Sequence, residues 1–128
     1  MKRLAFVALL AVAPAVLSAQ SSTRHAALKH ALRNLVVAQE NYFANHGTYT
    51  TDVSALGLFR GGKPADSVWV QVVNAGGRSW NGRAIHMAAN GKSCVIYVGF
   101  KTDLPSAPVT DADSLPAKNE GEPVCDRM

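Results

Sequence analysis

The sequence contains no apolar run long enough to cross a membrane. Its longest run, residues 4–17, falls short of the roughly 20 residues that a membrane-spanning helix requires. The formal net charge is only +4, and the basic residues are spread along the chain. That distribution argues against a nucleic-acid surface, which needs a dense basic patch. With two cysteines, the chain also lacks the framework of a cysteine-rich domain.

Motifs that carry catalysis are missing as well. Residues 60–63 have the sequence RGGK, without the spacing of a phosphate-binding loop or a preceding strand pattern. No serine occupies a G-x-S-x-G turn, which would present a nucleophile. Cys94 would be a nucleophile only as a free thiol, and a second cysteine is available to pair with it. We therefore expect no catalytic residue and no enzymatic activity.

Metal ligands do not occur at useful spacings. His25 and His30 are five residues apart, so they do not share a helix face as an i, i+4 pair would. The other two histidines are His46 and His86. Asp111 and Asp113, in the segment TDADS, faintly resemble a calcium loop, but the glycine and the later glutamate are absent. A zinc site and a calcium loop are the alternatives; we expect packed or solvated side chains, no metal and no cofactor.

The N-terminus has the order of a secretory signal peptide. Lys2 and Arg3 precede the apolar run, and Ser18 and Ala19 then precede a polar segment. We expect cleavage after Ala19, which leaves residues 20–128 as one domain in the periplasm or outside the cell. A retained membrane anchor is the alternative. Glutamine rather than cysteine follows the predicted cut, so we expect no lipid attachment.

An amphipathic helix is predicted from Thr23 to Asn45. Apolar residues recur there at steps of three and four, which is the helical period. The predicted buried stripe consists of Leu28, Leu32, Leu35, Val36, Gln39, Tyr42 and Phe43. Gly47 is placed to end the helix, and Asp52 to cap a short turn that follows it.

Three strands are predicted beyond this helix. Residues 68–73, 79–88 and 93–100 are rich in β-branched and alternating residues, and Gly-Gly and Asn-Gly pairs lie between them. We therefore predict an α+β fold, in which the helix packs on a three-stranded antiparallel meander. Residues 101–128, which contain several prolines, are predicted to form an irregular tail.

The two cysteines are expected to form a disulfide. Cys94 lies in the third predicted strand and Cys125 near the end of the tail. An even number of cysteines in a small exported domain favours a bridge. Such a bridge would tie down a tail that has few large apolar residues; two free thiols are the alternative.

One segment of the helix resembles a known family. Residues 32–49, LRNLVVAQENYFANHGTY, followed by SALGL at residues 54–58, are similar to the helix end and first loop of type IV pilins and type II secretion pseudopilins. The resemblance is strongest over residues 28–58. It implies a headgroup with a helix, an antiparallel sheet and a cysteine-closed C-terminal segment. The long apolar prepilin helix of that family is not present before the matching segment, so we do not expect ordinary pilus assembly.

The predicted function is that of an exported, non-catalytic, pilin-like interaction module. The resemblance implies a protein partner, such as a pilin-like subunit or a secretion component. The alternative is a periplasmic binding domain for a small ligand or nucleic acid, with no role in a pilus or secretion system. Trp69 is the candidate binding residue if it and Gln71 point away from the helix; otherwise it belongs to the core.

Overall fold

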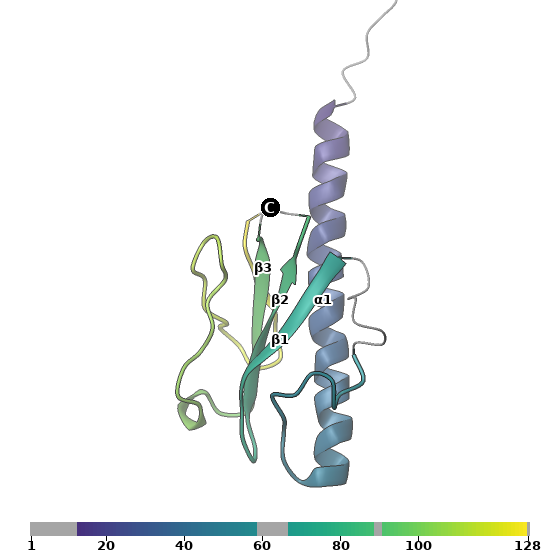
Figure 1. The fold of residues 1–128 in the computed structure, drawn as a ribbon. Helices are drawn as coiled ribbons and strands as arrows, with labels where there is room; N and C mark the ends of the chain where they lie inside the picture. The colour runs from purple at the N-terminus through teal and green to yellow at the C-terminus, as the bar shows by residue number, and fades with distance from the viewer. Residues whose placement is uncertain (1–12, 59–66, 89–90, 128) are drawn as a thin grey trace, which may run out of the picture.

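A helix packs on an antiparallel sheet in the computed structural model, which describes residues 13–58, 67–88 and 91–127 (Figure 1). The elements within these residues are α1 (Ala13–His46), β1 (Val68–Ala75), β2 (Trp80–His86), β3 (Ser93–Val98), the short 3-10 helix η2 (Lys101–Asp103) and β4 (Val124–Cys125). The sheet has the order β1-β2-β3-β4 with antiparallel neighbours. The predicted α+β class is confirmed.

Helix α1 is longer than predicted. It begins at Ala13 rather than Thr23, and its backbone is helical across the predicted cleavage position after Ala19. The polar residues around Thr23 do not cap the helix, because the preceding alanine and leucine residues also favour helix. Figure 1 shows the N-terminal part of α1 extending beyond the sheet. Over its described length, α1 lacks the sustained hydropathy of a membrane-spanning helix.

The C-terminal end of α1 is the one predicted, within one residue. Gly47 has a φ of 71°, a left-handed conformation that glycine adopts without strain. Its N–H donates to the carbonyl of Phe43 at 2.8 Å, which closes the last turn. Asp52 then caps the following turn, since its carboxylate accepts from the N–H groups of Ser54 and Ala55.

The core lies between α1 and the facing side of the sheet. The helix contributes Leu28, Leu32, Leu35 and Gln39, and the sheet contributes Val68, Val72, Trp80, Ala84, Cys94 and Ile96. Removing each leucine side chain from water contributes roughly 1.5–3 kcal/mol. Gly82 leaves no room for a side chain, because a Cβ there would be 2.6 Å from the carbonyl oxygen of Gln71 on the adjacent strand and 3.3 Å from Leu35 of α1. The absence of a side chain at this position thus permits the packing of Leu35 on β2.

The sheet has a fourth strand that was not predicted. Val124 and Cys125 form β4, in which Cys125 pairs with Cys94 of β3 and Val124 with Val95. The predicted meander of three strands is therefore wrong by one strand, because two residues are too few for a period to be recognised. The strand limits also differ: β1 runs on to Ala75 through an irregularity after Val72, and β2 and β3 are shorter than predicted.

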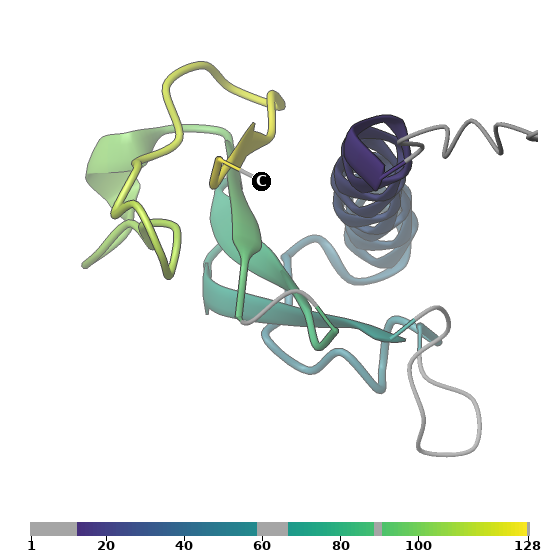
Figure 2. The same ribbon diagram turned by 90° about the horizontal axis from the view of Figure 1, so that it is seen from above.

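The tail is pinned as expected. Cys94 and Cys125 form a disulfide across β3 and β4, and the 31-residue separation corresponds to about 3–4 kcal/mol in the chain-entropy account. Apart from η2 and β4, the tail is irregular, with one isolated bridge between Val109 and Pro116. Viewed from above, it lies on the side of the sheet away from α1 (Figure 2). Val95 points to that side and is completely buried.

The packing of α1 predicts opposite effects for two neighbouring substitutions. Leu35→Asp buries a charge without a partner, so it should lower the free energy of unfolding by more than about 3 kcal/mol or prevent folding. Arg33→Asp alters an exposed position and should change stability by less than about 0.5 kcal/mol. Urea unfolding followed by circular dichroism measures both, and equal losses would contradict this packing.

Candidate functional site

Strand β1 presents two different faces. Val68 and Val72 are buried against α1, whereas Trp69 and Gln71 are exposed on the opposite, outer face. Trp69 is 45% exposed. The condition set for a binding role from the sequence, that Trp69 and Gln71 point away from the helix, is therefore met.

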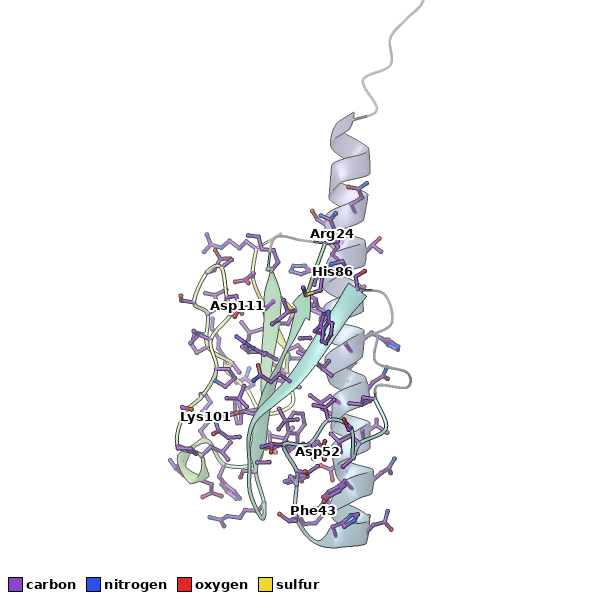
Figure 3. All side chains as sticks on the ribbon, in the orientation of Figure 1. Arg24, Phe43, Asp52, His86, Lys101 and Asp111 are labelled. Atoms are coloured by element: carbon purple, nitrogen blue, oxygen red, sulfur yellow. A yellow bond between two sulfur atoms is a disulfide. The ribbon has the colours of Figure 1, made fainter. Side chains whose placement is uncertain are left out.

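A groove of about 520 Å³ lies beside these residues, between the outer face and the tail. Its lining residues are Gln71, Val73, Arg83, Ala107, Pro108, Val109, Thr110, Asp111 and Ser114. Arg83 of β2 crosses it: Nε donates to Oε1 of Gln71 at 2.9 Å, and Nη1 donates to Oδ1 of Asp111 at 2.7 Å. Figure 3 shows Asp111 on the tail, across the sheet from α1. The tail residues that line the groove, residues 107–111 and Ser114, form its outer side and are called the tail wall. The ion pair of Arg83 and Asp111 thus joins the sheet to the tail wall.

Two asparagines hold the tail where it approaches the groove. The side-chain nitrogens of Asn74 and Asn81 both donate to the carbonyl of Ser106, at 2.6 and 2.7 Å. Oδ1 of Asn81 in turn accepts from the backbone and side chain of Asn74. Asn81 is almost fully buried, and these bonds satisfy its amide.

The other end of the wall is held by Asp126. This residue has no exposed surface, and its carboxylate accepts from the N–H groups of Ser93, Ala112 and Asp113 at 2.9, 3.1 and 2.7 Å. The hydroxyl of Ser93 donates to it at 3.4 Å and accepts from the N–H of Asp111 at 2.8 Å. The turn that carries Asp111 is therefore fixed against the start of β3.

The ionised form of Asp126 is strongly favoured. Burial alone would raise the pKa of this carboxyl, but the hydrogen bonds from Thr110, Ser93, Asp113 and Ala112 outweigh burial. They lower the pKa from its usual 3.8 to about 2. The carboxylate is consequently a fixed structural anion at neutral pH.

The two carboxylates that were considered as calcium ligands, those of Asp111 and Asp113, are also bonded to protein groups. Asp111 pairs with Arg83, and Oδ2 of Asp113 accepts from the N–H of Arg127 at 2.7 Å. These carboxylates are directed at protein donors rather than at a common point, so they do not form the faintly indicated calcium loop. Residues 60–63, which were weighed as a phosphate loop, lie outside the described residues.

The histidines are separated and serve individual contacts. Their partners are the carbonyl of Asp126 for His25, Asn34 for His30, the carbonyl of Tyr42 for His46 and the N–H of Ala88 for His86. Across residues 13–58, 67–88 and 91–127, no three His, Cys, Asp or Glu residues are grouped to hold a metal ion. The two cysteines of the chain are bonded to each other, so Cys94 is not available as a nucleophile.

The segment that carries the family resemblance forms a latch between α1 and the following loop. The Gln39 amide donates to the carbonyl of Thr50 at 2.7 Å and accepts from its N–H at 3.1 Å. The Tyr49 hydroxyl donates to Glu40 at 3.0 Å, and its ring lies 4.8 Å from that of Phe43. Burial, followed by the contact with Glu40, raises the pKa of Tyr49 to about 12.

A second groove, of about 460 Å³, follows the solvent side of α1 near this latch. Asn34, Val37, Asn41 and Leu56 are among its lining residues. Val37 is 61% exposed. Among the described residues that line this groove, none is Asp, Glu, Lys or Arg.

No protein-family model matches the chain, and no curated protein matches it.

Arg83 and the tail wall were not identified as site residues from the sequence. A charge on a strand that is otherwise largely buried was the available signal, because such a group needs a partner. Its partner, Asp111, is 28 residues away in the chain.

Asp126→Asn should test the anchor of the groove. At pH 7 the side-chain amide of the variant would place its own N–H donors opposite the backbone N–H groups that now donate to the carboxylate. We therefore expect a loss of about 2–3 kcal/mol in the free energy of unfolding. Because the folded pKa lies below the unfolded one, the wild-type contribution is present above about pH 4 and is lost as the pH falls toward 2. Urea unfolding between these pH values should show the two proteins converging.

Glu122→Gln is the matched control, because Glu122 is exposed and contacts only Asn119 among the described residues. It should follow the wild type at every pH. A constant difference between wild type and Asp126→Asn down to pH 2 would contradict the assigned role of the carboxylate.

Proposed function

We propose that this chain is an exported, non-catalytic binding module related to the headgroups of type IV pilins and type II secretion pseudopilins. The observation that carries the proposal is the latch of Gln39, Glu40, Phe43 and Tyr49. These residues are the distinctive part of the family-like segment, and each makes a contact that joins the helix end to the loop. The resemblance supports the proposal more strongly because its residues contact one another in the structure, in addition to being similar in sequence.

The remaining architecture supports the same proposal. A single long helix, an antiparallel sheet and a disulfide-closed C-terminal segment follow one another in the order that the resemblance implies. The proposed partner is a protein, namely a pilin-like subunit or a secretion component. A role without catalysis is consistent with side chains that are committed to structural bonds around the groove.

Export is part of the proposal, and the disulfide supports it because such bonds persist in oxidising compartments. We expect the mature protein to begin at Gln20 or within two or three residues of it. Such a cut would shorten α1 and retain the contact of His25 with Asp126. N-terminal sequencing of the protein from its own cells measures this; a chain that keeps Met1 and fractionates with membranes would contradict it.

The partner class is tested by affinity capture from an envelope extract of the source cells. Tagged mature domain should enrich pilus or secretion components. Leu35→Asp serves as an unfolded control and should capture none specifically, whereas Arg33→Asp serves as a folded control and should behave as the wild type. Enrichment of no such component by the folded baits would overturn the proposed partner class.

The second candidate function is binding of a small ligand in the periplasm. The groove on the outer face favours it, because the groove is lined by several polar side chains, among them Gln71, Arg83 and Asp111. Nucleic acid fits less well, since Arg83 is already paired with Asp111.

A further inference from the structure

We infer that the groove on the solvent side of α1 binds an extended, uncharged peptide segment of a protein partner, whose backbone pairs with the side-chain amides of Asn34, Asn41 and Asn45. The inference rests on the proposed role as a protein-binding module and deepens it, because it names the part of the partner that is recognised. This groove shares no lining residue with the groove on the outer face of the sheet.

The groove lies between α1 and the short turn that follows it (Figure 1). Three asparagines of α1 line it, and apolar side chains lie beside them. The apolar lining residues are Val37, Ala38, Ala55 and Leu56. None of the described lining residues is Asp, Glu, Lys or Arg, so the groove offers no carboxylate, ammonium or guanidinium group to a charged ligand. A charged segment would lose hydration there without gaining an ionic partner.

The three amides retain unused hydrogen-bonding groups. Within residues 13–58, 67–88 and 91–127, the side chain of Asn41 makes no hydrogen bond. Asn45 uses only Nδ2, which donates to the backbone carbonyl of Asn41 at 3.0 Å, and Asn34 uses only Nδ2, which lies 3.2 Å from Nε2 of His30. Each Oδ1 is therefore free to accept a hydrogen bond, and Nδ2 of Asn41 is free to donate one. Such amides are complementary to peptide groups, which also donate and accept.

The spacing of the amides matches an extended chain. The three asparagines are separated by seven and four residues, so they lie on one face of α1. Asn41 and Asn45 are about 6 Å apart along the helix axis, close to the roughly 6.6 Å between alternate residues of an extended chain. The distance from Asn34 to Asn45 along the axis is about 16.5 Å, which is the length of about five extended residues.

A folded or helical partner surface would suit this groove less well. The peptide groups of a helix are already bonded to one another, so the amides of the groove would find few backbone partners. An extended segment carries free N–H and C=O groups along its edge. Val37, which is 61% exposed, and Leu56 provide apolar surface for one side chain of that segment.

Both sides of the groove are ordered before a partner binds. The two hydrogen bonds between Gln39 and Thr50 hold the loop against α1, and Asp52 caps the turn that carries Ala55 and Leu56. Groups that are already ordered lose less entropy on binding. The latch of the family-like segment therefore positions one side of the proposed peptide site.

Nuclear magnetic resonance titration of isotope-labelled protein, purified in its exported form, tests the inference. The probes are four blocked hexapeptides in which serine alternates with valine, leucine, isoleucine or tyrosine. At least one should bind with a Kd between about 50 µM and 5 mM and shift the backbone signals of residues 34–45 and 55–56. The same peptide with methylated backbone nitrogens should bind at least roughly tenfold more weakly, because it keeps its side chains but cannot donate to the three Oδ1 atoms.

Substitution of the asparagines tests the assigned contacts. Asn41→Ala should weaken peptide binding roughly tenfold, and Asn45→Ala should weaken it roughly threefold, because more of the Asn41 amide is free. Alanine favours helix more than asparagine does, so both variants should remain folded, which thermal melts confirm. Asn119→Ala is the matched control, because it removes an exposed amide that does not line the groove, and it should leave binding unchanged.

Several outcomes would overturn the inference. They are no binding of any of the four peptides at about 10 mM, equal binding of the methylated peptide, and equal binding by Asn41→Ala and wild type. Peptide-induced shifts confined to the groove on the outer face would also overturn it. Signals of the groove that move with protein concentration alone would assign the surface to a second copy of the chain, which contradicts the inference as well.

Failure here is distinguishable from failure of the proposed function. Capture of pilus or secretion components without peptide binding rejects the peptide site alone. Peptide binding that depends on Asn41, without such capture, rejects the pilin-type partner and retains a protein-binding module.

Discussion

The buried carboxylate of Asp126 connects segments that are distant in the chain. It bonds to the start of β3 through Ser93 and to the tail turn through Ala112 and Asp113. The backbone carbonyl of Asp126 forms a hydrogen bond with the His25 side chain of α1. The neighbouring Cys125 is joined to Cys94 beside Ser93, so a covalent bond and a charged hydrogen-bond network fix the same junction. Because burying this carboxylate would be costly without those donors, the network and the closed tail require one another.

The sheet separates two kinds of chemistry. On the α1 side, packing is apolar and includes one satisfied amide, that of Gln39. On the outer side, polar side chains join the tail to the strands through Asn81, Arg83 and Asp126. Because the apolar packing on the α1 side stabilises the fold, the outer side can keep hydrogen-bond donors and an aromatic surface exposed to solvent. This division makes a polar groove on the outer face compatible with a small core.

The sequence predicted those parts of the fold in which a pattern repeats. The stripe from Leu28 to Gln39 and the three longer strands follow periods of 3.6 and two, so they were recognisable. Strand β4 has two residues and therefore no period. Asp126 was missed because a carboxylate in a polar tail has the same local appearance whether solvated or buried. The sequence left Trp69 open between an outward face and the core, and the structure places it outward. The groove on that face depends on Arg83 meeting Asp111 across 28 residues.

The tail wall has a consequence for how this protein can diversify. Residues 107–109 and Asp111 line the groove, while Asn81 and Asp126 hold the segment at its two ends. Most of these wall residues are exposed and contribute little to the core, in contrast to Thr110, which is buried. The segment is thus a replaceable loop on a constant frame, comparable in principle to the hypervariable loops of an immunoglobulin domain. Exchanging these few positions would change the shape and chemistry of the groove while helix, sheet and disulfide stay the same.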